Sequence, residues 1–290
     1  MSKARDIRRR IRSIQSTRQI THTMEMVAAS KLRRAQERVR AARPYAAKLA
    51  EVISGLFAPE LAETYPMLRQ PEGVRRSALV LLTSNRGLAG GFNVNLIREA
   101  RGVLDEFRAD GVDVEFHVVG RRGINFFQFR REPMKAMRQD ISDRPSMEDA
   151  RSLIDALIPR FESGELDAID IVYAHFKHAL STPPTRMRVL PISPPDDSRR
   201  ARSFNYLFAP SAEEILTFVL PLYVRNAVYR ALVESAAAEQ GARMTAMKNA
   251  TDNADELVKS LTLQYNKARQ AQITQELTEI TGGAEAQRGQ

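Results

Sequence analysis

Two long segments, one at each end of the chain, contain almost none of the residues that end helices. Residues 3–57 hold a single Gly and a single Pro, Pro44, and residues 211–281 also hold one of each. Both segments are otherwise rich in Ala, Arg, Lys, Leu and Met, which favour helices. We therefore expect two helices, about 80 Å and about 105 Å long. No single globular domain is that wide, so both helices should protrude from whatever lies between them.

Small and apolar residues in both segments recur at alternating steps of four and three, the heptad seam of a coiled coil. The first seam, Ala28 to Leu56, continues backwards through polar positions before it becomes apolar again at Ile7–Ile14. The second seam runs from Ile215 to Thr278 and turns polar near its end. We expect the two helices to pair antiparallel, with the polar C-terminal tip overrunning its partner. A capping box at 211–214 should start the second helix, and Gly282-Gly283 should end it.

The middle of the chain alternates between strands and helices. We expect strands at 77–83, 112–119, 168–175 and 186–192, and helices at 93–108, 123–129 and 146–161. Such alternation predicts a small, mostly parallel sheet. The expected fold class is α/β: a long antiparallel coiled coil of the terminal helices around a central Rossmann-like domain. The expected boundaries are a first helix at 1–57, a linker at 58–76, the α/β domain at 77–209 and a last helix at 210–290.

The positive charge is concentrated at the N-terminus. Residues 1–48 hold 14 Lys and Arg against 3 Asp and Glu, whereas the whole chain has a net charge of +9. A segment of this kind suits an anionic partner, such as nucleic acid, lipid headgroups or an acidic protein surface. A solvated helix face without a partner is the alternative. The longest apolar runs are much shorter than the roughly 20 residues that span a bilayer, and the polar, basic N-terminus is unlike a secretory signal.

Signals for catalysis are weak. The glycine-rich loop Ser84–Asn93 follows a strand and opens a helix, so it could cradle a phosphate. It lacks the Lys-Ser/Thr of a P-loop and the spacing of a dinucleotide fingerprint, which favours a structural turn. His175 and His178 would point to opposite faces of a strand, which disfavours a metal site. The chain has no Cys, which excludes disulfides and Cys-ligated metals. We expect no catalytic residue, cofactor or metal in this chain.

Four stretches of the sequence resemble the gamma subunits of F-type ATP synthases. Met24–Lys31, followed by Arg43-Pro-Tyr45, resembles the N-terminal helix of that family, and Asn266–Ile280 resembles its C-terminal signature. Asn85–Asn93 resembles its central glycine loop, and Glu239–Lys248 also matches. The resemblance covers the whole chain in order.

The resemblance implies a central-stalk rotor that couples transmembrane ion flow to ATP synthesis or hydrolysis, without a catalytic site of its own. Its implied partners are the alpha and beta chains of the catalytic ring, the epsilon subunit and the membrane c-ring. It implies no nucleic acid partner and no segment that spans lipid. The implied location is peripheral, on the cytoplasmic face of a bacterial inner membrane.

The family motifs also imply contact residues. Contacts with the catalytic ring should involve Met24, Glu25, Arg269, Gln270, Thr274 and Glu276. Arg33 and Arg34, with Arg9 and Arg10, are candidates by charge alone for an acidic segment of the beta chain. Arg243 should support the shaft and is counted with the ring contacts. Tyr206 should lie at the foot, near epsilon and the c-ring.

Two other functions remain open from the residues alone. The basic N-terminal segment would suit a nucleic-acid-binding coiled-coil protein, which predicts salt-dependent binding of duplex DNA. The glycine loop would suit a dinucleotide-binding enzyme, which predicts measurable affinity for NAD or ATP. The rotor hypothesis predicts neither as a function.

Overall fold

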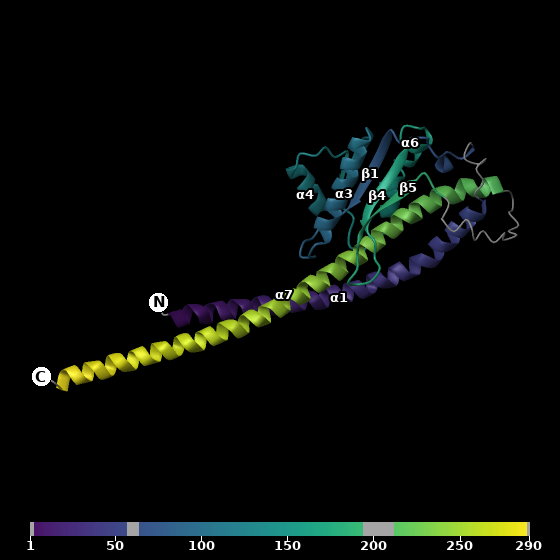
Figure 1. The fold of residues 1–290 in the computed structure, drawn as a ribbon. Helices are drawn as coiled ribbons and strands as arrows, with labels where there is room; N and C mark the ends of the chain where they lie inside the picture. Colours follow the sequence, from purple (N-terminus) through teal and green to yellow (C-terminus); the bar gives the residue numbers. More distant parts are fainter. Residues whose placement is uncertain (1–2, 57–63, 194–211, 289–290) are drawn as a thin grey trace. The chain divides into compact units, whose positions relative to one another are not determined.

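A computed structural model describes residues 3–56, 64–193 and 212–288. Two long helices enclose an α/β region in the chain order, as the sequence predicts (Figure 1). The elements are α1 Lys3–Leu56, η1 Pro66–Leu68, β1 Arg76–Leu82, α3 Phe92–Ala109, β2 Asp113–Val119, α4 Arg121–Phe129, β3 Ala136–Arg138, α5 Met147–Ile154, α6 Ile158–Glu162, β4 Ala168–Ala174, β5 Pro184–Leu190 and α7 Ala212–Arg288.

The chain forms two compact units, and both long helices belong partly to each. Residues 28–243 form the globular unit, and residues 1–27 with 244–290 form the second, which we call the arm unit. The expected α/β range, 77–209, therefore covers only part of the globular unit. That unit also takes in the second half of α1 and the first part of α7.

The sheet of the globular unit has five strands in the order β3-β2-β1-β4-β5. Strand β1 pairs parallel with β2 and β4, and β2 pairs parallel with β3. The last strand, β5, returns antiparallel to β4. The mostly parallel sheet that the sequence predicts is confirmed. The central strands β1 and β4 are buried almost throughout, which explains why they appear in the sequence as unbroken apolar runs.

Alternate residues of β1 face two different helical layers. Ala78, Val80 and Leu82 join a core with buried residues of α5, α6 and the first part of α7. Leu79 and Leu81 point to the opposite face. There α3 crosses the sheet and contacts β1, β2, β4 and β5. The domain is therefore a three-layer α/β structure, and α7 is part of one layer.

The seam predicted for the second half of α1 is confirmed at seven of its eight positions from Ala28 to Ile53, and Ala42 is half-buried. Ala28, Leu32, Ala35, Val39, Ala46, Leu49 and Ile53 are all buried, with 1–8% of each residue exposed. The helix runs without interruption through Pro44. A proline costs one backbone hydrogen bond, and a helix held by packing on either side tolerates that loss.

The seam predicted for the start of α7 is wrong, because it follows a different face of the helix from the one that is buried. The core positions there are Leu216, Leu220, Val224 and Val228. The predicted Ile215 and Val219 are only half-buried, on the flank of that core. The reason is that this part of α7 packs on the sheet domain as well as beside α1, so a single coiled-coil seam does not describe it. Residues 231–240 are buried at every position.

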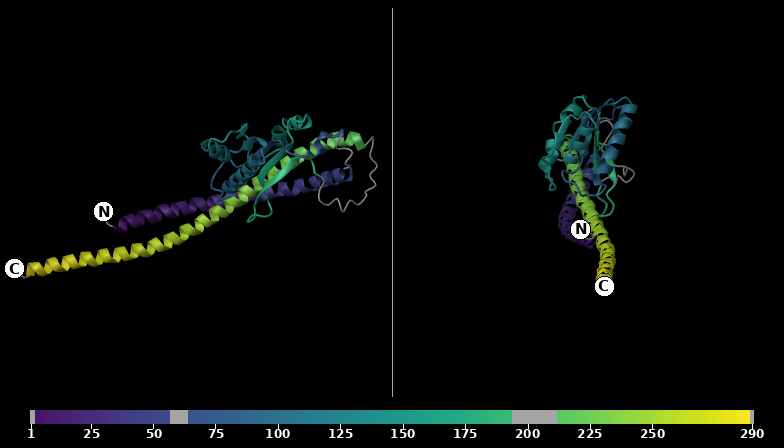
Figure 2. Two further views of the ribbon diagram at one scale, coloured as in Figure 1. Left: turned by 45° about the horizontal axis from the view of Figure 1, so that its top comes forward. Right: turned by 90° about the vertical axis from the view of Figure 1, so that its left-hand side faces the viewer.

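In the arm unit, the two helices run antiparallel, and both chain ends lie at the same end of the unit (Figure 2). Two polar contacts join them where the seam is polar. Thr21 and Thr251 place their hydroxyls 2.8 Å apart, and Arg18 pairs with Asp255. The polar gap in the heptad pattern is therefore an interhelical contact.

Three other details differ from the sequence predictions. Helix α7 does not end at Gly282-Gly283 but continues to Arg288. Neither glycine has a positive φ, so the left-handed turn by which glycine ends a helix does not form. The helix expected over 146–161 is two short helices, α5 and α6, and Pro159 stands in the first turn of the second. The three-residue strand β3 was not predicted. The expected cap at Ser211 lies outside the described residues.

Candidate functional site

The site residues predicted on α1 lie on both sides of the boundary between the units. In the arm unit, Met24 and Glu25 are half-buried, and Glu25 Oε2 lies 3.5 Å from His22 Nδ1. In the globular unit, Arg33 and Arg34 are exposed. Their contacts are local to the helix: Arg33 lies 3.8 Å from Glu37 and Arg34 donates to Ser30 over 3.1 Å. Exposed pairs of this type contribute little to stability, so both guanidinium groups remain available to a partner.

The basic residues nearest the N-terminus are similarly placed. Arg9 and Arg10 are exposed on the arm unit, and Arg9 lies 3.6 Å from Asp6. Their charges stay in solvent, where their field extends about 10 Å at ordinary salt. This part of α1 is therefore a basic surface, in agreement with the charge distribution of the sequence.

The four site residues predicted near the C-terminus all lie on exposed helix. Arg269, Gln270, Thr274 and Glu276 point to solvent in the arm unit. Glu276 accepts a hydrogen bond from Gln272, one turn earlier, over 2.8 Å. We call residues 264–284 the tip; most of its residues are exposed.

The tip also carries apolar side chains that the sequence reasoning missed. Ile273, Leu277 and Ile280 are 46%, 57% and 68% exposed. Their spacing of four and three places them on one face of the helix. The predicted seam followed Ala271, Gln275 and Thr278 instead, and so made the tip appear polar. An exposed stripe of large apolar residues marks a surface that another chain covers.

Arg243 differs from the other predicted contacts because it is buried, at 8% exposure. One of its guanidinium nitrogens donates to Glu239 over 2.6 Å and to the carbonyl of Gly87 over 3.2 Å. Its side chain is therefore committed to contacts within the globular unit. Tyr206, the residue predicted at the foot, lies outside the described residues.

Polar groups of the glycine loop form hydrogen bonds within the α/β domain. Ser84 N donates to Asn93 Oδ1 over 3.0 Å, and the side chain of Asn85 accepts from Arg121 N. The Asn85 amide donates to the carbonyls of Gln139 and Ile141. These bonds join the ends of three loops, which is what the structural-turn interpretation predicts.

The two histidines considered as a metal pair are bound separately. His175 Nδ1 lies 2.6 Å from Glu234 Oε2 on α7, and His178 Nδ1 accepts from Leu180 N. Glu234 is 3% exposed, so the His175–Glu234 contact holds the end of β4 against α7. Within the described residues, no group of three His, Asp or Glu side chains could hold a metal ion.

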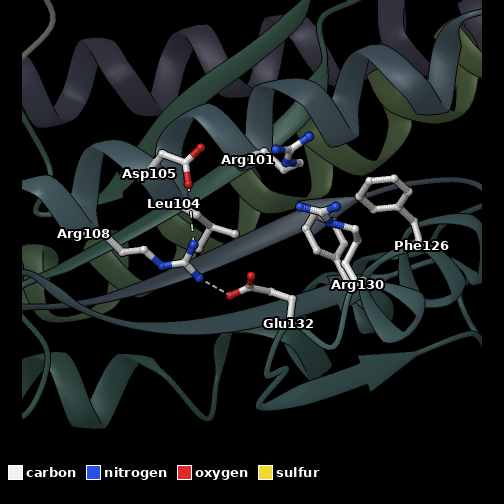
Figure 3. Close-up of a pocket in the computed structure, with 8 residues that line it drawn as sticks. Arg101, Leu104, Asp105, Arg108, Phe126, Arg130 and Glu132 are labelled. Carbon is white, nitrogen blue, oxygen red and sulfur yellow. Dashed lines mark hydrogen bonds and ion pairs between the residues drawn. The ribbon is translucent and has the colours of Figure 1, made fainter.

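A shallow hollow lies between α3 and α4, lined by charged side chains (Figure 3). Arg108 pairs there with Glu132 and lies 3.5 Å from Asp105. Arg101 and Arg130 line the same hollow. Because carboxylates within the hollow already balance part of its charge, we interpret it as a surface ion-pair network.

Across the described ranges, none of the helices is both long and apolar enough to cross a bilayer. The chain's long helices are mixed in polarity, and the globular unit buries a large apolar core, although Phe129, Leu180 and Phe218 are exposed on it. The predicted contact residues that are exposed lie on the arm unit and on the basic face of α1.

Comparison with known proteins gives a consistent result over the full length. A family model described as ATP synthase matches residues 3–287. The ATP synthase gamma chain of Gemmatimonas aurantiaca is 55% identical over 290 residues, 100% of both chains. That of Desulfitobacterium hafniense is 47% identical over 286 residues, 99% of each chain.

Solved structures agree with this result. A chain from the central stalk and c-ring of the Tetrahymena thermophila mitochondrial ATP synthase is 26% identical, with a TM-score of 0.59. The match covers 80% of this chain and 99% of that one. A chain of the Euglena gracilis mitochondrial enzyme, 20% identical, has the same fold, with a TM-score of 0.67 over 99% of this chain and 95% of that one.

Proposed function

This chain belongs to the ATP synthase family as a gamma chain, the non-catalytic rotor subunit of the central stalk, and we propose which of its surfaces meet the other subunits. The arm unit stands inside the ring of alpha and beta chains, and the tip reaches deepest into it. Rotation of the shaft within that ring would impose different conformations on successive catalytic sites. Ion flow through the membrane part of the complex would drive this rotation.

The exposed apolar stripe of the tip is the single observation that best supports this placement. Ile273, Leu277 and Ile280 lie on one face, and Arg269 and Gln270 lie just before them. A stripe of this kind in solvent is unfavourable, because each buried methylene group gains about 0.8 kcal/mol relative to water. A collar of apolar side chains around the tip would remove that cost, and the polar residues beside it would hydrogen-bond to the same collar.

The basic face of α1 supports a second contact. Arg33 and Arg34 hold only weak pairs on their own helix. An acidic segment of a beta chain would give them charge-assisted bonds, which are about twice as strong as neutral ones. Met24 and Glu25 lie two to three turns earlier on α1, in the arm unit, and would contact the same ring.

Another segment of the chain would form the foot. We propose that the segment with Tyr206 meets the epsilon subunit and the membrane c-ring. The Tetrahymena chain to which this one is similar belongs to a central stalk and c-ring, which supports this assignment. Because the similar gamma chains of Gemmatimonas aurantiaca and Desulfitobacterium hafniense are bacterial, we place the complex on the cytoplasmic face of a bacterial inner membrane.

Substitution of the stripe in the assembled complex tests the placement of the tip. We would replace Leu277 and Ile280 by Ser and measure ATP hydrolysis and ATP-driven ion pumping in membranes. Phe129→Ser is the matched control, because Phe129 is an apolar residue of α4 that is 86% exposed.

We expect the tip variant to lose assembly or turnover, while the control retains both. The α/β domain should keep its fold in both variants. Unchanged hydrolysis and pumping in the tip variant would contradict the placement of the tip in the ring. Failure of the unmodified chain to assemble with a nucleotide-binding ring would contradict the whole proposal.

A further inference from the structure

A set of charged contacts lies at the two chain boundaries of the globular unit. On α7, Arg243 is the last residue of the globular unit, and on α1 that unit begins at Ala28. Lys31 lies within one helical turn of Ala28. We call Lys31, Asp143, Glu239 and Arg243, with the carbonyl of Gly87, the exit clasp.

The exit clasp ties each helix to a different loop of the α/β domain. On α1, Lys31 Nζ donates to Asp143 Oδ2 over 2.6 Å, in the loop that precedes α5. On α7, Arg243 donates to the carbonyl of Gly87 in the glycine loop over 3.2 Å. Glu239, one turn before Arg243, accepts from the same guanidinium over 2.6 Å. Each helix thus has one directional bond to the domain at its exit.

The part of the clasp on α7 is buried. Arg243 and Glu239 are 8% and 9% exposed, whereas Lys31 and Asp143 keep about a third of their side chains in solvent. Burial raises the pKa of the Glu239 carboxyl, and the charge of Arg243 opposes that rise. The charges of Asp143 and Lys31 also act on Glu239, so the two ties are close enough to influence each other.

Buried ion pairs seldom stabilise a fold more than apolar side chains would, so their presence here calls for another role. The neighbouring surface of α7 is made of small residues, among them Ala236, Ala237 and Gly241. Apolar contact of this kind is not directional, so only the fit of the packed side chains resists rotation of the helix about its own axis. A charge-assisted hydrogen bond has a defined geometry and fixes the angle of the helix.

We propose that the exit clasp transmits torque between the α/β domain and the two helices of the shaft. This inference rests on the proposed function of the chain as a rotor. Arg243 acts as a positioning residue: it holds the angle of α7 through the glycine loop. Lys31 does the same for α1 through Asp143. Without these ties, the domain could turn by a larger angle before the shaft follows.

Torsional stiffness of the rotor in the assembled complex tests this proposal. The catalytic ring is immobilised and stalled with Mg-ADP, and a probe is attached to the α/β domain of this chain. Because the chain has no Cys, Gln128→Cys on the exposed side of α4 supplies a single attachment point. The measured quantity is the variance of the angular fluctuations of the probe.

The test variant is Arg243→Gln and the matched control is Arg225→Gln. Arg225 joins α7 to Asp155 by two bonds of 2.7 and 3.1 Å, so both variants remove an ion pair of α7. Arg225 lies 18 residues before Arg243, about 27 Å along the helix and far from the exit. We expect the variance to rise about twofold in Arg243→Gln, because one of the two directional ties at the exit is lost. The control should match the unmodified complex.

Equal variance in Arg243→Gln and the unmodified complex would overturn the proposal, as would an equal rise in the control. If Arg243→Gln does not assemble, Asp143→Asn replaces it, because Asp143 is partly exposed and its loss leaves the buried pair intact. The same outcomes then apply. These results leave the rotor assignment intact as long as the unmodified chain assembles and turns.

Discussion

The hydroxyl pair between the arms, Thr21 and Thr251, makes a quantitative prediction. The two oxygens lie 2.8 Å apart, and the two residues are 9% and 7% exposed. Each oxygen also lies near a carbonyl of its own helix, at 3.0 Å from Arg18 O and 2.9 Å from Met247 O. Two hydroxyls have only two hydrogens for these three contacts. One hydrogen must therefore cross between the helices while the other stays within its own helix.

The number of available hydrogens determines how much each substitution lowers the free energy of unfolding. When Thr21 is replaced by Val, Thr251 still donates to Met247, so no buried donor is left without an acceptor. The loss is one net hydrogen bond, about 1 kcal/mol. The same holds for Thr251→Val. When both are replaced, two apolar groups of the same shape meet in the seam, and the change should be close to neutral. The double variant should thus be more stable than the sum of the singles by about 2 kcal/mol.

Native-state amide exchange of the full chain measures these free energies locally, at helical amides near the two threonines. Thr17→Val, combined with Thr251→Val, is the control. Thr17 is exposed, and its hydroxyl donates to Ser13 O on its own helix. Its effect should add to that of Thr251→Val. If the effects of Thr21→Val and Thr251→Val also add, the hydroxyls do not meet and the helix register is wrong.

Three further predictions concern the α/β domain. Asp170→Asn should destabilise the sheet by about 3 kcal/mol, because it removes the charge of a buried carboxylate that pairs with Arg186 and Arg188 of β5. Amide exchange of β4 measures this loss. Gly120→Ala should lower the urea midpoint by more, because Gly120 has φ of 96° and a Cβ there would lie 2.1 Å from Thr83 O. Burial lowers the pKa of His117 below 6.5, so the folded domain binds that proton less readily than the unfolded chain. The stability of the domain should stay constant above pH 6.5 and fall as the pH drops towards the lowered pKa of His117. The variant His117→Gln should reduce this pH dependence of the urea midpoint.

Patterns that depend on a single environment were predictable from the sequence. The α1 seam from Ala28 to Ile53 keeps a single period, and seven of its eight positions are buried. The strands β1 and β4 are buried on both faces and appear as apolar runs for that reason. The start of the helix predicted at 146 is also correct, because Ser146 caps α5 in a capping box with Asp149. These features are local or strictly periodic.

Features set by tertiary contacts were not predictable. The start of α7 meets the sheet domain as well as α1, so no single period showed which of its residues form the core. Gly282 and Gly283 do not end α7, because glycine ends a helix by a left-handed turn and neither residue has a positive φ. The burial of Arg243 depends on Gly87, which is 156 residues away in the sequence. The exposed tip stripe could have been found, because the spacing of Ile273, Leu277 and Ile280 is visible in the sequence.

The stretch 231–240 of α7, which is buried at every position, has a consequence for how this chain can vary. Most helices tolerate substitution on the turn that faces water, so their tolerance rises and falls every three to four residues. In this stretch the tolerance should not vary with that period, because every residue is packed against a neighbour. Four of the ten positions in the stretch, Ala231, Ala236, Ala237 and Ala238, hold the smallest side chain that has a Cβ. A library of variants should therefore accept only residues of similar volume and polarity across this stretch, because an unpaired polar group buried there would be costly. The tip, about seven turns later, should accept changes of size freely outside its apolar stripe.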